Sequence, residues 1–221
     1  MNTRKALLLG ASGLVGGHCL DLLLQDEGYD TVTILIRKQL AKSHPKLTQH
    51  IVNFDHLRDY ADFFQVDDVF CCLGTTIKKA GSQEAFRKVD FTYAYDAAQL
   101  SAEKGARHFL LVSSLGADAN SSVFYSRVKG ELEMAVSALP FPAVSIFQPS
   151  LLLGERSEFR FGERFAEPVL KVLSFLLIGP LRKYRPIEAH TVAAAMIKIA
   201  KAQTQGLKIY ESDQVQELGK L

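Results

Sequence analysis

The chain has 221 residues, of which 48% are hydrophobic, and its 26 Lys and Arg nearly balance its 24 Asp and Glu. A chain of this length buries enough surface to fold without a metal ion or disulfide bonds, so we expect one domain over residues 1–221. The balanced charge argues against a nucleic acid or an anionic membrane as partner and favours a small-molecule substrate.

Cysteine usage indicates a reducing compartment, because the chain has only Cys19, Cys71 and Cys72 and a disulfide between adjacent residues is strained. The N-terminus lacks the apolar region and cleavage site of a signal peptide. The longest apolar segment, at 169–181, contains Lys171 and is too short to span a bilayer. We therefore expect a cytoplasmic protein without a membrane span, and both a monomer and a homodimer stay open.

Short apolar runs alternate with segments of helical periodicity along the first two thirds of the chain. Runs that are apolar at consecutive positions are typical of parallel strands covered on both faces. The order predicts an α/β fold with a doubly wound parallel sheet of the Rossmann type, which binds ligands at the carboxyl ends of its strands. The expected strands are KALLLG, TVTILIR, QHIVNF, DVFCCLG, HFLLVSS and AVSIFQP, and the expected helices cover 14–25, 82–104 and 125–139.

Beyond Pro149 this alternation gives way to a region rich in Arg, Glu and Phe that extends to Pro186. We expect an insertion at 150–186 within the single domain that acts as a substrate lid. Its aromatic residues could line a pocket for a modest apolar substrate, although aromatic side chains more often belong to a core. They are Phe159, Phe161, Phe165 and Tyr184.

The first expected strand runs directly into LLLGASGLVGG, with Gly10, Gly13 and Gly16 at the start of the first helix. Glycines in this context allow a tight turn and close approach to a pyrophosphate, and the helix N-terminus attracts anions. The stretch predicts a dinucleotide site, with Ser12, Leu14 and Val15 lining the same loop. A simple packing turn is the alternative interpretation.

The second expected strand ends in Arg37 and Lys38 rather than in the acidic residue typical of NAD sites. Two cations there suit a 2′-phosphate, so we expect NADP as the cofactor, with NADPH preferred over NADH. A solvated strand end would also explain the charges. After the third strand, Phe54 and Asp55 could flank an adenine and accept from its amino group.

The fourth strand ends at Leu73, Gly74 and Thr75, and the fifth ends at Ser114. The carboxyl ends of parallel strands meet at one crevice, so we expect these residues to share a site with the glycine loop and with Tyr125 in the helix that follows. A helix cap or turn is the ordinary alternative for the serine.

Taken together, GASGLVG, LVSS and YSRVK resemble the short-chain dehydrogenase/reductase superfamily. CLGTT at 72–76 and KAGS at 79–82 resemble its atypical branch containing the Tat-interacting protein 2 oxidoreductases and their bacterial relatives. The resemblance implies that Tyr125 is the general acid in reduction, that Lys129 stabilises its phenolate and holds the nicotinamide ribose, and that Ser114 binds the carbonyl oxygen. It also implies cofactor contacts at Pro149 and Leu151.

The chain departs from the superfamily pattern at two points. Asp90 stands where extended members have Asn, which puts the proton relay in doubt, and Gln148, Pro149 and Ser150 replace the frequent Arg-Pro-Gly. The six histidines lack zinc-site spacing, so no metal site is expected.

These patterns predict an NADP(H)-dependent oxidoreductase. A non-catalytic NADPH-sensing binding protein is the alternative, and a nucleotide-sugar epimerase is disfavoured because the 150–186 insertion is short. A third interpretation takes the basic residues near the fourth strand as an anion or nucleic-acid patch, against a solvated helix entry. They are Lys78, Lys79, Arg87 and Lys88.

Overall fold

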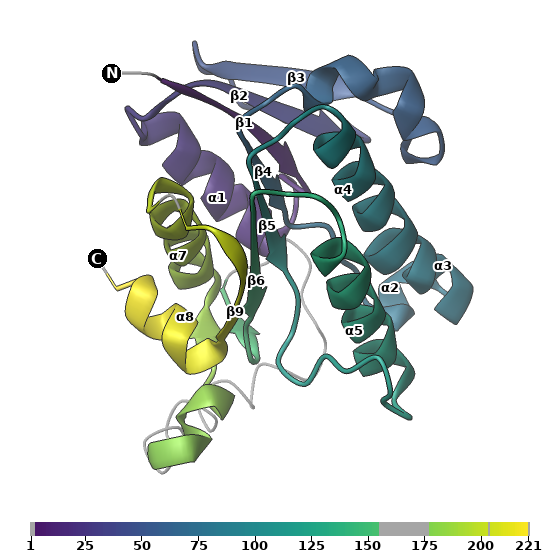
Figure 1. The fold of residues 1–221 in the computed structure, drawn as a ribbon, viewed down its shortest axis with the longest axis vertical. Coiled ribbons are helices and arrows are strands. Elements are labelled where there is room, and N and C mark those ends of the chain that lie inside the picture. The colour runs from purple at the N-terminus through teal and green to yellow at the C-terminus, as the bar shows by residue number, and fades with distance from the viewer. Residues whose placement is uncertain (1–2, 155–176, 203, 221) are drawn as a thin grey trace.

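The computed structural model describes residues 3–154, 177–202 and 204–220. Within them, seven parallel strands form one sheet in the order β3-β2-β1-β4-β5-β6-β9 (Figure 1). The first six confirm the strands expected from the sequence. Their bounds are β1 Arg4–Leu9, β2 Tyr29–Ile36, β3 Leu47–Ile51, β4 Asp68–Cys71, β5 His108–Val112, β6 Ala143–Gln148 and β9 Gly206–Glu211.

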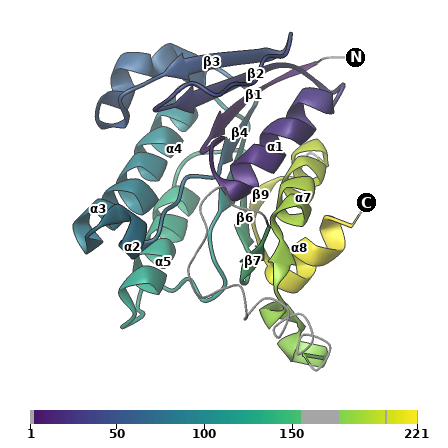
Figure 2. The same ribbon diagram turned by 180° about the vertical axis from the view of Figure 1, so that it is seen from behind.

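Helices cover both faces of the sheet, as the Rossmann prediction requires (Figures 1 and 2). One face carries α1 (Leu14–Gln25), α7 (Ala189–Lys201) and α8 (Ser212–Leu218), and the other carries α4 (Tyr93–Glu103) and α5 (Phe124–Ser137). Further helices lie between these elements in the chain. They are η1 Phe54–Phe64, α2 Ile77–Ala80, α3 Gln83–Arg87 and η4 Gly179–Tyr184.

The central strands are apolar at consecutive positions because each face of the sheet has its own core. In β1, Leu8 packs into the core beneath α1 and α7, whereas Leu7 and Leu9 pack into the core beneath α4 and α5. All three are fully buried. Burial on both faces removes the period-two alternation of a half-exposed strand.

The helix expected over 82–104 is interrupted. Ser82 caps α3 by accepting from the Ala85 N–H at 3.0 Å. A π-helical turn, η2 (Lys88–Thr92), then separates α3 from α4. Such turns shift the register of the residues that follow, and here the turn carries Asp90, which is 1% exposed.

The sequence did not predict β9, the edge strand beyond β6. Leu207 and Ile209 in it are 46% and 47% exposed, so the strand lacks the buried run by which the others were recognised. Before it, β7 (Leu152–Leu153) pairs with β8 (Ile187–Glu188) and joins the two ends of the expected insertion at 150–186. Most of that insertion, residues 155–176, lies outside the described residues.

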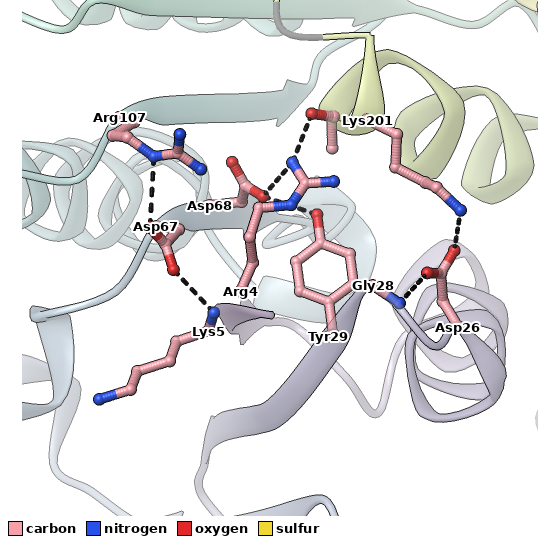
Figure 3. A network of polar contacts seen from close by, with 10 residues as sticks. Arg4, Lys5, Asp26, Gly28, Tyr29, Asp67, Asp68, Arg107 and Lys201 are labelled. Atoms are coloured by element: carbon pink, nitrogen blue, oxygen red, sulfur yellow. Dashed lines mark hydrogen bonds and ion pairs between the residues drawn. The ribbon is translucent and has the colours of Figure 1, made fainter. Parts of the chain in front are cut away.

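A polar network ties the amino ends of the strands together (Figure 3). Arg4 Nη1 donates to Asp68 Oδ2 at 3.0 Å and to the Ala200 carbonyl in α7 at 2.8 Å. The Tyr29 hydroxyl donates to the same Asp68 oxygen at 2.7 Å. These contacts lock β1, β2, β4 and α7 at the edge of the sheet opposite to the carboxyl ends.

Strand order reverses between β1 and β4, with β2 and β3 on one side and β5 and β6 on the other. In a doubly wound sheet the crevice at this switch point, outside the carboxyl ends, is where ligands bind. We therefore expect a ligand-binding site among the residues that follow β1, β4 and β5.

Candidate active site

The glycine loop follows β1 and packs tightly against the end of β4. Gly10 has φ +83°, and a Cβ there would lie 2.4 Å from the Cys72 carbonyl oxygen. A Cβ at Gly16 would lie 2.1 Å from the Gly10 carbonyl oxygen, and the Gly13 N–H donates to that same oxygen at 2.9 Å. Gly10 and Gly16 are thus required by the packing of the loop itself, before any ligand is considered.

The N-terminus of α1 is open to an anion. Gly13 is its N-cap, no side chain caps it, and its first turn carries no acidic residue. Ser12 beside it is exposed, Leu14 is half-buried and Val15 is buried. A phosphate could therefore meet Ser12 and backbone N–H groups, while the Val15 side chain belongs to the core.

Arg37 and Lys38 follow β2 directly, and both are exposed. β2 pairs with β1 in register as far as Leu9 opposite Leu35, so the two strands end side by side. The two cations thus follow the strand that neighbours the glycine loop.

At the end of β3, Phe54 is only 6% exposed and packs on Tyr93, with ring centroids 5.5 Å apart. Asp55 Oδ1 accepts from the Tyr93 hydroxyl at 2.8 Å and pairs with Lys88 Nζ at 2.7 Å. These hydrogen bonds from Lys88 and Tyr93 lower the pKa of the Asp55 carboxyl. An adenine amino group would have to share Asp55 with both donors.

Asn53 was not predicted from the sequence as a site residue, but it is a further candidate for the adenine contact. The third strand was expected to run through Phe54, which placed Asn53 inside it, but β3 ends at Ile51. Asn53 is exposed, and its Oδ1 accepts from the Asp55 N–H at 3.0 Å. A prediction that ended the third strand at Ile51 would have placed Asn53 after the strand, among the candidate site residues.

Leu73, Gly74 and Thr75 follow β4 at the switch point, where the Cys72 N–H donates to the Leu9 carbonyl at 2.9 Å. Leu73 is half-buried against the core beneath α4 and α5. The Thr75 N–H donates to Asp90 Oδ2 at 2.8 Å. The turn after β4 is thereby fastened to the π-helical turn.

Asp90 also pairs with Lys129, and this ion pair is almost completely buried. Lys129 Nζ lies 2.7 Å from Asp90 Oδ1, and the side chains are 5% and 1% exposed. Burial lowers the pKa of Lys129, but the interactions with Asp90 and Tyr125 outweigh it and the pKa is raised. The ammonium therefore stays charged despite its burial.

Tyr125 and Lys129 lie one turn apart on α5. The Tyr125 ring is half-buried and contacts Phe86, with ring centroids 5.5 Å apart. Ser114 follows β5, and its buried hydroxyl has no hydrogen-bond partner among the residues that the structure describes. A buried hydroxyl with unused hydrogen-bonding capacity is suited to a ligand oxygen.

Glu133 lies one turn beyond Lys129 and connects α5 to β6. Gln148 Nε2 donates to both Glu133 carboxylate oxygens, at 3.0 and 2.9 Å. Burial raises the pKa of Glu133, although the hydrogen bonds from Gln148 and the charge of Lys129 oppose this. The departure at Gln148 thus has a structural role beside the site.

Pro149 and Leu151, the expected contacts after β6, both use their backbone carbonyls within the fold. The Pro149 carbonyl accepts from the Leu115 N–H at 2.9 Å, and the Leu151 carbonyl accepts from the Ile187 N–H at 2.9 Å. The Leu151 side chain is 45% exposed, so it is available to a ligand, whereas Pro149 is buried.

Of the basic residues near β4, Arg87 pairs with Glu131 and Lys88 with Asp55. This pairing supports a solvated, partly neutralised surface over an anion patch. Tyr184, in η4, is 54% exposed. The other aromatic residues proposed to line a pocket lie outside the described residues, namely Phe159, Phe161 and Phe165.

Within residues 3–154, 177–202 and 204–220, no group of three or more His, Cys, Asp or Glu is arranged to hold a metal ion. No helix in those segments has the length and apolar character needed to cross a bilayer.

Comparison with solved structures agrees with this architecture. UDP-N-acetylglucosamine 4-epimerase from Methanobrevibacter ruminantium, in complex with UDP-N-acetylmuramic acid, aligns with a TM-score of 0.70 and 14% identity over 96% of this chain and 77% of that one. UDP-glucose 4-epimerase from Thermotoga maritima aligns with a TM-score of 0.66 and 16% identity over 98% and 81%. At these identities the likeness shows the fold alone.

Sequence relatives are more similar. Rat (Rattus norvegicus) protein HTATIP2 is 41% identical over 170 residues, which are 75% of this chain and 70% of that protein. Protein FMP52, mitochondrial, from Lodderomyces elongisporus is 31% identical over 215 residues, 92% of this chain and 90% of that protein. The model of the NAD dependent epimerase/dehydratase family matches residues 6–219. The chain therefore belongs to the NAD-dependent epimerase/dehydratase family and is a relative of HTATIP2 and FMP52, as the resemblance predicted.

Proposed function

We propose that this protein is an NADP(H)-dependent oxidoreductase that interconverts a carbonyl group and an alcohol on a small substrate. One observation carries the proposal. Tyr125 and the charged Lys129 share one face of α5, and Ser114, whose hydroxyl has no hydrogen-bond partner in the described part of the chain, follows β5 at the same carboxyl edge as the glycine loop.

The residues along the crevice fit a dinucleotide. The uncapped N-terminus of α1 suits a pyrophosphate, and the exposed Arg37 and Lys38 suit a 2′-phosphate. Asn53 or Asp55 would accept from the adenine amino group. Thr75, Pro149 and Leu151 follow strands on the nicotinamide side.

When bound, the nicotinamide would supply or accept a hydride. Ser114 would donate its hydroxyl hydrogen bond to the substrate carbonyl oxygen, and Tyr125 would give its phenolic proton to that oxygen during reduction. Lys129 would stabilise the phenolate and hold the ribose hydroxyls. Leu151 and the half-buried Phe124 would offer an apolar surface to the substrate.

Cofactor preference is tested by thermal unfolding with equal concentrations of NADPH and NADH. NADPH is expected to raise Tm more than NADH. Arg37→Ala should weaken NADPH binding by about tenfold or more, since it removes a charge-assisted hydrogen bond, and should leave NADH binding unchanged. Equal shifts with both nucleotides would overturn the NADP preference, and no shift with either would overturn the cofactor assignment.

A second candidate is an NADPH-sensing protein that does not turn over a substrate. The buried partner of Lys129 favours it, because Asp90 neutralises the charge that would activate Tyr125. The two are separated by incubating protein and NADPH with a panel of aldehydes and ketones. Cofactor consumption that Tyr125→Phe abolishes would support the enzyme, and NADPH binding without consumption would support the sensor.

Two other assignments are weaker. The first of the solved structures named above is a complex with UDP-N-acetylmuramic acid, but this chain covers only 77% of that enzyme. A UDP-sugar therefore serves as a control ligand in the thermal unfolding assay. A cytoplasmic location is still a prediction from cysteine usage, and the FMP52 relatives are named as mitochondrial. Fractionation of the source cells would decide between the two compartments.

A further inference from the structure

Asp90 is a buried acid at the centre of the candidate site, in the position where the resemblance led us to expect an amide. It lies on the π-helical turn between α3 and α4 and is 1% exposed. A carboxylate buried to this extent needs compensating partners, since desolvation strongly disfavours its charge. The groups that compensate the Asp90 charge therefore indicate its role at the site.

Asp90 contacts two different elements, one through a hydrogen bond to Oδ2 and the other through an ion pair at Oδ1. Oδ2 accepts from the Thr75 N–H at 2.8 Å, and Oδ1 lies 2.7 Å from Lys129 Nζ. A Cβ at Gly74 would come 3.5 Å from Oδ1 and 3.8 Å from Nζ. The pair therefore lies directly below the turn that follows β4, and Asp90 connects that turn to α5.

The other groups around Lys129 leave this pair as the dominant local charge. Tyr125 is one turn before it on α5, and Glu133 is one turn after it and is held by Gln148. From β4, burial raises the pKa of Cys71 to about 12, so that thiol is neutral. The ammonium that interacts with Tyr125 therefore has its charge already balanced by a carboxylate at contact distance.

We propose that Asp90 is a positioning residue that acts as the counter-ion of Lys129, and that it sets the pH range in which Tyr125 transfers its proton. This inference rests on the proposed function of the same site. With an amide in place of Asp90, the ammonium would be unbalanced and would stabilise the phenolate strongly. With the carboxylate, the phenol keeps its proton to higher pH, so the pH above which it can no longer act as the acid in carbonyl reduction is raised.

The direct test is a titration of the Tyr125 phenol that needs neither cofactor nor substrate. Phenolate absorbance in the ultraviolet is recorded against pH for the wild type, Asp90→Asn and the double variant Asp90→Asn/Lys129→Met. The spectrum of the same protein carrying Tyr125→Phe is subtracted from each, so that the other tyrosines cancel. Circular dichroism confirms that each variant is folded.

Asp90→Asn is expected to move the midpoint of Tyr125 ionisation down by about one pH unit or more, because an opposite charge nearby favours the ionised phenol. The double variant replaces a neutral ion pair by a neutral pair of side chains, so its midpoint should return close to that of the wild type. An unchanged midpoint in Asp90→Asn would overturn the inference. If that single variant does not fold, a double-variant midpoint well above the wild-type value would overturn it instead.

An activity measurement separates this inference from the proposed function. For any carbonyl compound that is reduced, kcat/KM in Asp90→Asn should fall off at a lower pH than in the wild type, by the shift seen in the titration. If the titration moves as expected and no compound in the panel is reduced, the charge role of Asp90 stands and the oxidoreductase proposal fails.

Discussion

At the scale of single residues, the burial and contacts of Tyr125 and Lys129 are more informative than their spacing. A phenol and an ammonium one helical turn apart occur on many solvated helices. Here the ammonium is 5% exposed and paired with Asp90, and the phenol packs on Phe86. Burial of a charged lysine beside a tyrosine is costly, which is why such arrangements concentrate at functional sites.

Removal of the phenolic hydroxyl is the sharpest single-residue prediction. Tyr125→Phe should lower kcat for carbonyl reduction by about a hundredfold or more, because proton transfer is lost, while NADPH affinity is kept. Steady-state kinetics and fluorescence titration with NADPH measure the two effects. Tyr95→Phe is the matched control, since Tyr95 stacks on Phe91 and is assigned no role at the site. Equal activity in the two variants would contradict the role of Tyr125.

At the scale of elements, two adjacent glycines on α1 have opposite constraints. A Cβ at Gly16 would meet the Gly10 carbonyl oxygen at 2.1 Å, whereas a Cβ at Gly17 would be 3.8 Å from the Ala11 carbonyl oxygen, an ordinary contact. The first must displace the backbone of the glycine loop. The second can be accommodated without any shift.

Gly16→Ala should therefore lower the free energy of unfolding by about 1–3 kcal/mol and weaken NADPH binding as the loop shifts. Gly17→Ala should leave binding unchanged and raise the free energy of unfolding by up to about 1 kcal/mol, as alanine is the better helix former. Urea unfolding and NADPH titration measure both quantities. Comparable stability and affinity in the two variants would contradict the packing described for the loop.

The strands show where element prediction succeeds. β1, β4, β5 and β6 are buried on both faces and are recognisable as continuous apolar runs. β9 was missed because its first four residues are exposed. The π-helical turn in the expected helix over 82–104 was also missed, since nothing in local propensity distinguishes one extra residue in a helical turn.

At the scale of the whole molecule, stability should depend on pH through His108. This residue, at the amino end of β5, is 3% exposed and lies 2.9 Å from Ser145 Oγ. Burial, with the nearby charges of Arg4 and Arg107, lowers the pKa of His108 from 6.5 to about 4. The folded protein therefore holds the neutral ring, and protonation favours the unfolded chain.

The contribution of His108 is fully present above pH 6.5, the unfolded value, and is lost as the pH falls towards 4. The loss should reach about 3 kcal/mol, at about 1.4 kcal/mol for each pH unit between the two values. Urea unfolding of the wild type and of His108→Asn across this range isolates the effect, because other titrating groups cancel in the difference. A constant difference between the two proteins would contradict the buried neutral state.

The sequence by itself determined the first six strands, the glycine loop that follows the first of them and most of the helices between them, and it predicted the candidate trio Ser114, Tyr125 and Lys129. These depend on local signals, namely apolar runs, helical spacing and the position of glycines relative to a strand end. Family membership also followed from motifs in chain order. Each of these features needs only residues that are close together in the chain.

The tertiary structure alone decided the partners of the charged side chains. It joined Asp90 to Lys129 and to the Thr75 backbone, occupied Asp55 with Tyr93 and Lys88, and placed Gln148 on Glu133. No local pattern predicts such pairs, because a charge is compensated by whatever the fold brings within contact distance. Burial increases the importance of these partners, since the stability of a charge removed from water depends almost entirely on its nearest neighbours.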